Sequence, residues 1–175
     1  MSFTNETIEQ DEIPQYQAIE LTLLPDSARL AAIISQLFIL VIALIITIIG
    51  RILNVPLFID MLAYWIIGVL SLTLLIMAWT WFSYRYKGYA LREHDIIYQR
   101  GVIWRKVTIL PFNRVQHVET QQGILQRYFD LTTLNLFTAG GMRADLAIHG
   151  MDVHITDGIK SMLLSRIQVE QQSDD

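Results

Sequence analysis

The residues in this chain best suited to acid–base or metal chemistry are its four histidines: His94, His117, His149 and His154. A zinc-binding helix needs the HExxH spacing, and no two of these histidines have it. Adjacent strands could bring His117 near His149, but chance proximity explains such a pair better than a metal site does. The chain contains no cysteine, which excludes thiolate metal sites, disulfides and cysteine nucleophiles.

Serine and glycine motifs of known enzymes are also missing. Ser161 and Ser165 fall in a predicted helix, without the GxSxG turn that presents a serine nucleophile. Gly140 and Gly141 form a pair, but no GK[ST] follows them to make a phosphate-binding loop. The long apolar segments hold no ionisable residue, which disfavours a proton relay or an ion pathway. We therefore predict a protein with no enzymatic activity, no metal and no cofactor.

A basic block lies between Arg85 and Arg114, where lysines and arginines outnumber acids by seven to two. Arg105 and Lys106 fall between two predicted strands, at the tip of a hairpin. Near an anionic membrane surface each cation would contribute about 1 kcal/mol of binding free energy. The residues predicted to contact lipid or a partner are therefore Arg100, Trp104, Arg105, Lys106 and Arg114. In the alternative interpretation, these cations only keep a strand edge soluble and unpaired.

The composition indicates a membrane protein, because 53% of the residues are hydrophobic and 17% are charged. Soluble domains have about 45–50% apolar and about 25% charged residues. From residue 85 onward, lysines and arginines barely outnumber acids, so nucleic acid is not expected as a partner. Membrane lipids are the expected contact instead.

Two uncharged apolar segments cover residues 30–50 and 61–84. A helix over the first, of about 21 residues, is about 31 Å long and matches a hydrocarbon core of about 30 Å. The second segment ends in aromatic residues followed by cations, which is typical of a membrane interface. The predicted interfacial anchors are Trp79, Trp81, Tyr84, Arg85 and Lys87. We predict a transmembrane helical hairpin over residues 29–84.

The link between the two predicted helices is short, residues 51–60, so the helices should be antiparallel. Lysine and arginine are enriched on the cytoplasmic side of membrane proteins. The link offers Arg51, whereas the outer flanks offer Arg29, Arg85, Lys87 and Arg92. Both termini, including the acidic segment 1–28, are therefore predicted to lie in the cytoplasm.

The chain after the second apolar segment consists of short β-branched and aromatic stretches separated by turn residues, a pattern typical of antiparallel strands. A short helical turn is expected at residues 124–129. Phe129, Leu134 and Leu136 are expected in the core. The predicted strands cover residues 89–93, 96–103, 106–110, 115–122, 131–138 and 144–149.

A last helix is predicted over residues 156–168, with Thr156 or Asp157 as its N-terminal cap. Its apolar stripe should pack on the sheet and consists of Ile159, Met162, Leu163 and Ile167. The predicted domain therefore covers residues 85–169, and residues 170–175 form a polar tail that is expected to fray.

Several short motifs of this region occur in a recognisable order. Gly101 lies inside the second predicted strand, and LP at 110–111 closes the third. RVQHV at 114–118, RYFDL at 127–131 and TAG at 138–140 follow. Over residues 89–151 this ordered set resembles the bacterial pleckstrin-homology-like (PH-like) domain of the YdbS/YdbT type, and the preceding two-helix hairpin is that family's usual layout. Many members carry glycine at the position of Asp130, so a slightly different turn is expected there.

The resemblance implies a mainly β, PH-like barrel or sandwich with a C-terminal α-helix, and it implies no enzymatic activity. It also implies action together with larger multi-pass relatives that carry several copies of the domain. We therefore expect a scaffold or interaction module at the cytoplasmic face of a bacterial inner membrane, assembling with such a relative or with itself. The alternative is a module that senses anionic lipid or a small ligand through the basic hairpin.

Overall fold

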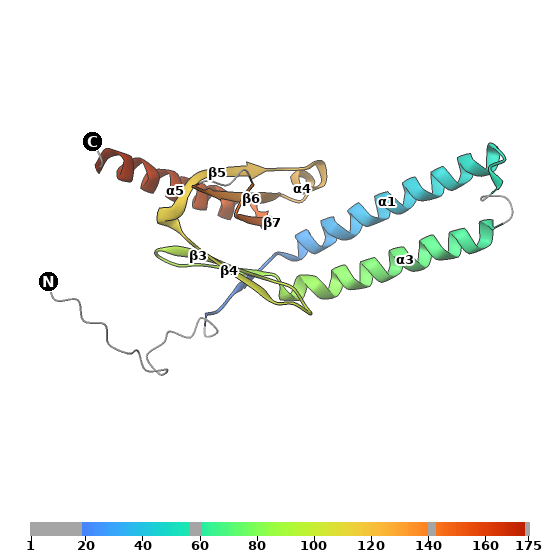
Figure 1. Cartoon of the computed structure of the whole chain (residues 1–175), viewed down its shortest axis with the longest axis horizontal. Helices are drawn as coiled ribbons and strands as arrows, with labels where there is room; N and C mark the ends of the chain where they lie inside the picture. The colour runs from blue at the N-terminus through green and yellow to red at the C-terminus, as the bar shows by residue number, and fades with distance from the viewer. Residues whose placement is uncertain (1–18, 57–60, 140–142, 174–175) are drawn as a thin grey trace.

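The computed structural model describes residues 19–56, 61–139 and 143–173, with side chains as far as Ser165. Two long helices form an arm, and a domain of strands and a further helix lies at its base (Figure 1). The described elements are, in order, β1 (Thr22–Leu23), α1 (Asp26–Ile52), α3 (Leu62–Ser83), η3 (Tyr84–Tyr86), β2 (Gly88–Leu91), β3 (Asp95–Arg100), β4 (Lys106–Pro111), η4 (Phe112–Arg114), β5 (Val115–Gln121), α4 (Ile124–Tyr128), β6 (Leu131–Thr138), β7 (Leu146–Asp152) and α5 (Val153–Ser173).

Helices α1 and α3 confirm the predicted antiparallel pair and lie side by side along their length (Figure 1). Both are long and apolar enough to cross a membrane. Gln36 Nε2 donates to Thr80 Oγ1 over 2.6 Å, and Trp65 Nε1 donates to Thr47 Oγ1 over 3.0 Å. Polar groups in a bilayer need internal partners, so these two bonds fix the pairing of the helices near both of their ends.

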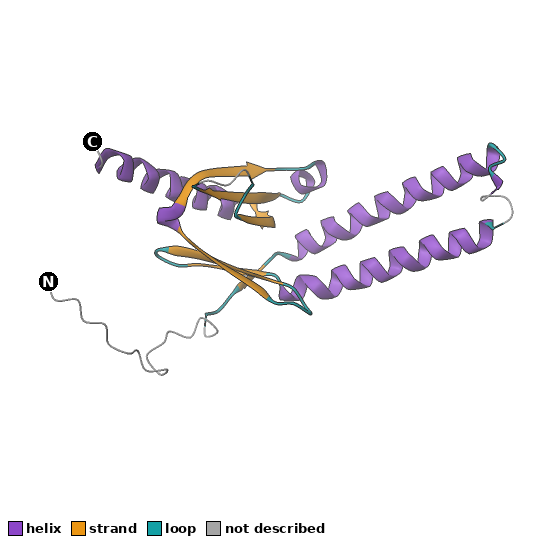
Figure 2. Cartoon of the chain, viewed as in Figure 1, coloured by secondary structure: helices purple, strands orange, loops and turns teal. Residues whose placement is uncertain are grey.

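The strands form two antiparallel sheets, with the order β1-β2-β3-β4 in the first and β5-β6-β7 in the second (Figure 2). Of the six predicted strands, the one over 131–138 has the predicted bounds and four others are found with shifts at their ends. The sixth runs later than expected, from Leu146 to Asp152. Helix α5 packs on the second sheet. These two sheets and the C-terminal helix confirm the predicted fold class.

Strand β1 was not predicted, and it joins the chain before the membrane helices to the domain. Thr22 pairs with Tyr89, and Leu23 pairs with Gly88. Leu24 is buried in the main hydrophobic core. The domain therefore includes residues that the sequence analysis placed in the acidic N-terminal segment, of which residues 1–18 lie outside the described part.

One turn differs from the prediction, and a second has an unusual backbone conformation. Gly101 does not lie inside a strand, because β3 ends at Arg100 and Gly101 has a φ of +103°. A Cβ there would lie 2.0 Å from the carbonyl oxygen of Trp104, so the turn requires glycine. Asp130 has a φ of 52°, the left-handed conformation that glycine adopts easily.

The main core lies between the two sheets and α5. Leu134 and Leu136 are fully buried, as predicted, whereas Phe129 is partly buried and packs against a smaller cluster of Ala28, Ala31 and Leu131. The most deeply buried side chains are Ile96, Leu131, Leu134, Leu136, Ile148, Met151, Thr156 and Leu163.

Helix α5 begins earlier than predicted, and its cap is a different residue. Asp152 Oδ1 accepts the N–H groups of His154 over 2.8 Å and Ile155 over 3.4 Å. Thr156 lies inside the helix, fully buried, so neither it nor Asp157 is the cap. Ile159 and Leu163 are buried as expected, and the side chain of Ile167 lies outside the described side chains. The helix continues to Ser173, so most of the predicted tail is helical.

Candidate membrane-surface site

The hairpin between β3 and β4 points toward the membrane helices. Gly88, which follows the end of the second membrane helix, pairs with Gln99, and β3 then continues to Arg100. Residues 101–105 therefore extend beyond the start of β2, back to the level of the helix ends (Figure 1). We call these residues, with Arg100 and Lys106 at their base, the membrane-side tip.

The membrane-side tip combines exposed apolar and basic side chains. Ile103 is 72% exposed and Trp104 is 87% exposed. Arg100 and Lys106 are paired across the base of the hairpin, and Arg105 follows Trp104 directly. Large apolar side chains flanked by cations suit the boundary between headgroups and acyl chains.

Arg114 is separated from the other predicted contact residues. Strand β4 runs away from the membrane-side tip, and Arg114 lies in η4 after its far end. The structure thus brings Arg100, Trp104, Arg105 and Lys106 together, and it places Arg114 at the opposite end of the hairpin.

The predicted anchors at the end of the second membrane helix divide into two groups. Trp79 is half-exposed, and the Trp81 ring lies 3.9 Å from the guanidinium carbon of Arg29. Tyr84 instead packs against both hydrophobic clusters, and Lys87 Nζ lies 4.0 Å from the centre of its ring. Arg85 is exposed. Tyr84 therefore ties the helix to the domain, a role that its sequence position did not indicate.

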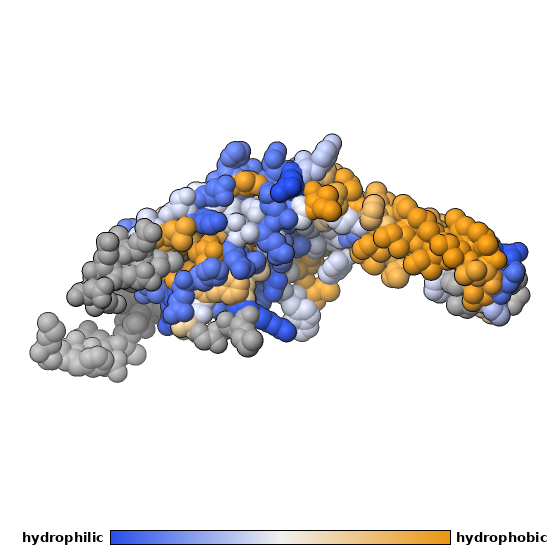
Figure 3. Space-filling view, turned by 90° about the horizontal axis from the view of Figure 1, so that it is seen from above, coloured by the Kyte–Doolittle hydropathy of each residue, from blue (hydrophilic) through white to orange (hydrophobic). Residues whose placement is uncertain are grey.

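A second exposed apolar group lies on α4, the short helix that packs beside α1. Ile124 is 92% exposed and Tyr128 is 81% exposed. Figure 3 shows hydrophobic surface continuing from the arm of membrane helices onto the adjoining edge of the domain. This group was not predicted, because residues 124–129 were expected only to form a short helical turn and not an exposed apolar surface.

Three basic side chains, Lys87, Arg100 and His149, lie near enough to influence one another's charge. Partial removal from water lowers the pKa of Lys87, and the positive charge of Arg100 lowers it further. Desolvation likewise lowers the pKa of His149, with added repulsion from Lys87 and Arg100. The register of β2 with β3 places Lys87 beside Arg100, in agreement with these directions.

The histidine pair and the serines that could take part in chemistry either lie far from each other or bond to nearby backbone groups. His117 lies opposite Phe137, whereas His149 lies opposite Thr133, so the two histidines do not meet. Ser161 and Ser165 donate to backbone carbonyls of their own helix. Within the described ranges, no group of three histidine or acidic side chains could hold a metal ion.

The sequence is similar to a known protein family and to a bacterial transmembrane protein. The sequence matches the family model described as Bacterial PH domain over residues 19–167. It is 37% identical over 82 residues to the UPF0699 transmembrane protein YdbS of Bacillus subtilis (strain 168), and the aligned part covers 43% of this chain and 52% of that relative. The match thus spans about half the length of the relative. No solved structure matches the chain at a significant level.

The chain belongs to the bacterial PH domain family, because the family match covers most of its length. The match begins before the first membrane helix, which agrees with the pairing of β1 to β2 across the helical hairpin. The protein is thus a membrane protein whose two apolar helices are inserted between the first two strands of a PH domain.

Proposed function

We propose that this protein is a non-enzymatic, membrane-anchored module whose PH domain rests on the cytoplasmic surface of the bilayer and engages anionic lipid through the membrane-side tip. The supporting observation is the position of Trp104 and Ile103, exposed on a basic hairpin at the level of the helix ends. Solubility of a strand edge alone would call for cations without a large exposed aromatic side chain. A cation–aromatic tip is better suited to lipid.

The test compares two variants, one with a reversed charge at the tip and one with a reversed charge at the far end of the hairpin. Arg105→Glu and Arg114→Glu make the same change of charge at opposite ends of the hairpin. The full chain is placed in vesicles of phosphatidylcholine with or without phosphatidylglycerol. The emission of Trp104 is obtained as the difference from Trp104→Phe, measured in the same background.

We expect Trp104 emission to be blue-shifted in anionic vesicles, and Arg105→Glu to shift it to the red. Arg114→Glu should leave the spectrum unchanged. Added salt should weaken the response of the unmodified chain, since exposed charges are screened over about 8–10 Å at ordinary ionic strength. Equal effects of the two charge reversals, or no dependence on phosphatidylglycerol, would contradict lipid contact by the tip.

A second candidate function is assembly with another PH-domain membrane protein or with a second copy of the chain. Strand β4 is an edge of its sheet, and its Ile109 is 45% exposed. An open edge with an apolar side chain can accept a further strand.

The assembly function is tested with two matched variants in mild detergent. Ile109→Lys should abolish partner recovery or reduce the oligomeric mass, because the charge would be buried at the new interface. Ile155→Lys on α5 is the control, as Ile155 is 44% exposed. Equal recovery with both variants would exclude this edge as the interface.

A further inference from the structure

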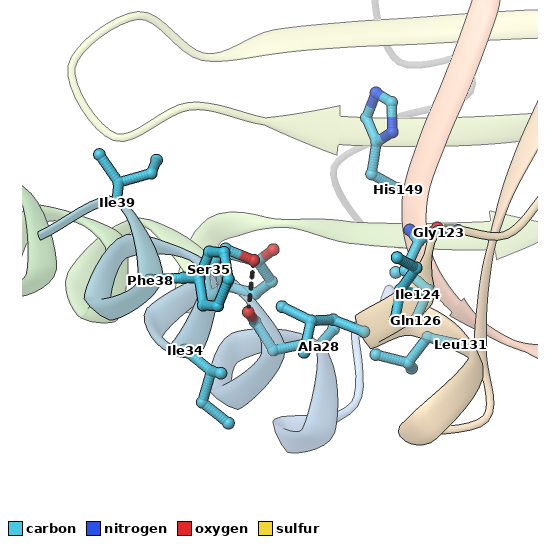
Figure 4. A pocket seen from close by; sticks show the side chains of 15 residues that line it. Ala28, Ile34, Ser35, Phe38, Ile39, Gly123, Ile124, Gln126, Leu131 and His149 are labelled. Atoms are coloured by element: carbon cyan, nitrogen blue, oxygen red, sulfur yellow. Dashed lines mark hydrogen bonds between the residues drawn. The ribbon is translucent and has the colours of Figure 1, made fainter. Parts of the chain in front are cut away.

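A cavity of about 640 Å³ lies where α1 enters the domain. Its walls come from α1, α4 and the start of β6 and the end of β7, with Tyr84 completing them. Figure 4 shows Ser35, Phe38 and Ile39 of α1 on one side, facing His149 and the α4 segment on the other. The volume falls in the range of about 300–1,000 Å³ that is typical of small-molecule sites.

The α1 wall of the cavity crosses from headgroup depth into the hydrocarbon. With 27 residues, α1 is about 40 Å long and exceeds a hydrocarbon core of about 30 Å. Its uncharged segment starts after Arg29. In a bilayer Ala28 and Ala31 therefore lie near the headgroups, whereas Ile34 and Phe38 lie deeper and expose their side chains.

Close packing holds the shallow end of this wall against the domain. Ala28 is buried beside Gly150, where an added Cβ would lie 2.7 Å from the Cβ of Ala28. Gly150 also has a φ of +81°, so both the close contact and the backbone conformation favour glycine there. The cavity is thus framed by a fixed contact between α1 and β7.

The domain side of the cavity presents His149, whose ring is oriented by a chain of hydrogen bonds. Gln126 Nε2 donates to Thr133 Oγ1 over 3.0 Å, and Gln126 Oε1 accepts the N–H of Gly123 over 2.9 Å. Thr133 Oγ1 also lies 3.2 Å from His149 Nδ1, within hydrogen-bond distance. Where the Thr133 hydroxyl donates to Nδ1, neutral His149 carries its proton on Nε2.

Positive charge lies near His149. Lys87 stacks on Tyr84, which lines the cavity, and Lys87 and Arg100 both act on the charge of His149. No carboxylate lines the cavity among the described residues. An anionic headgroup would offset the repulsion between Lys87 and Arg100 and would favour the protonated form of His149.

We propose that the cavity binds one anionic phospholipid of the surrounding leaflet, with its phosphate near His149 and Lys87 and an acyl chain along Ile34 and Phe38 of α1. This goes beyond surface attraction at the membrane-side tip, because none of the residues that line the cavity belongs to the tip, although Arg100 at the base of the tip adds to the positive charge nearby. The occupant is a lipid rather than a protein helix because the cavity joins an apolar wall at acyl depth to cations at headgroup depth.

The test uses the full chain in a neutral detergent with equal amounts of phosphatidylglycerol and phosphatidylcholine of identical acyl chains. Native mass spectrometry then counts retained lipids. We expect one phosphatidylglycerol per chain, preferred at least tenfold over phosphatidylcholine. Ser35→Trp fills the cavity and should reduce this occupancy at least tenfold. Leu37→Trp is the control, since Leu37 is exposed on α1 but does not line the cavity.

Two further variants separate the headgroup contacts from the tip. His149→Ala and Lys87→Gln should each reduce the preference for phosphatidylglycerol, even if Ser35→Trp fails to fold. Arg114→Glu, at the far end of the hairpin, should leave retention unchanged. The tip proposal is tested separately by Trp104 emission, so its failure can be distinguished from failure of the cavity inference.

Equal retention of the two lipids, or unchanged occupancy in Ser35→Trp, would overturn the inference. A dimeric mass that Ser35→Trp abolishes would also overturn it, because the cavity would then hold a helix of a second copy.

Discussion

Gly101 is a single residue on which the shape of the membrane-side tip depends. Gly101→Ala would combine a positive φ with a Cβ only 2.0 Å from the Trp104 carbonyl oxygen. We expect a cost of about 1–3 kcal/mol in unfolding free energy or a rearranged tip. Thermal unfolding of the full chain in detergent measures the loss.

The matched control for Gly101→Ala is Gly158→Ala in α5. Gly158 has open space around its Cβ position and no left-handed conformation. Alanine in a helix interior is favoured over glycine by about 0.5–1 kcal/mol, so this variant should melt at the same temperature or higher. A similar loss in both variants would show that the Gly101 turn is not strained by a side chain.

Leu136 tests the core at the same scale. It is fully buried between the sheets, and truncating a buried leucine to alanine costs about 2–5 kcal/mol. Small domains have about 5–15 kcal/mol of stability, so Leu136→Ala should melt much earlier or be degraded. Ile109→Ala, at an exposed position of β4, should melt normally. Normal melting of Leu136→Ala would contradict the register of β6.

Residue types and spacing predicted the central core residues but not the contacts between distant segments. Leu134 and Leu136 were predictable because alternation along β6 places them on one face. The grouping of Lys87, Arg100 and His149 was not predictable, because it needs the register of β2 with β3 and the placement of β7. Arg114 was assigned to the basic group from its proximity in sequence, which ignores the reversal of the chain along β4.

At the scale of elements, the contact between α1 and β7 decides how the domain sits on its anchor. Gly150→Ala introduces a clash with Ala28 and a side chain at positive φ. We expect the domain to remain folded but to change its distance from α1. Because the chain has no cysteine, spin labels at Leu30→Cys and His154→Cys report this distance in wild type and variant.

An unchanged distribution of distances in Gly150→Ala would contradict the role of this contact. Gly123→Ala is a suitable control, since the nearest atom to an added Cβ is 3.8 Å away, at the flexible end of Gln126. It should leave both stability and distance unaltered.

The element prediction was accurate wherever local pattern decides the structure. The two membrane helices and five strands follow from hydropathy and β-branched stretches. Strand β1 has two residues and exists because β2 offers an edge to pair with, so no local pattern could reveal it. The start of α5 was predicted too late, because Asp152 is both the last residue of β7 and the cap of the helix.

For the whole molecule, topology follows from the distribution of basic residues. A reporter active only in the cytosol should work after Asp175, and one active only outside should work near Asn54. The reason is that Arg29, Arg85 and Lys87 flank the hairpin on the domain side. The opposite pattern of reporter activity would place the domain on the outer face.

The central claim is that the membrane-side tip rests in the bilayer surface. Its most direct test is the depth of spin labels at Ile103→Cys and at His94→Cys, which lies exposed at the other end of the same sheet. In vesicles containing phosphatidylglycerol, the account predicts that the label at 103 is more accessible to oxygen than to a polar nickel chelate. The label at 94 should show the reverse. Equal, water-like accessibility at both positions would contradict the account.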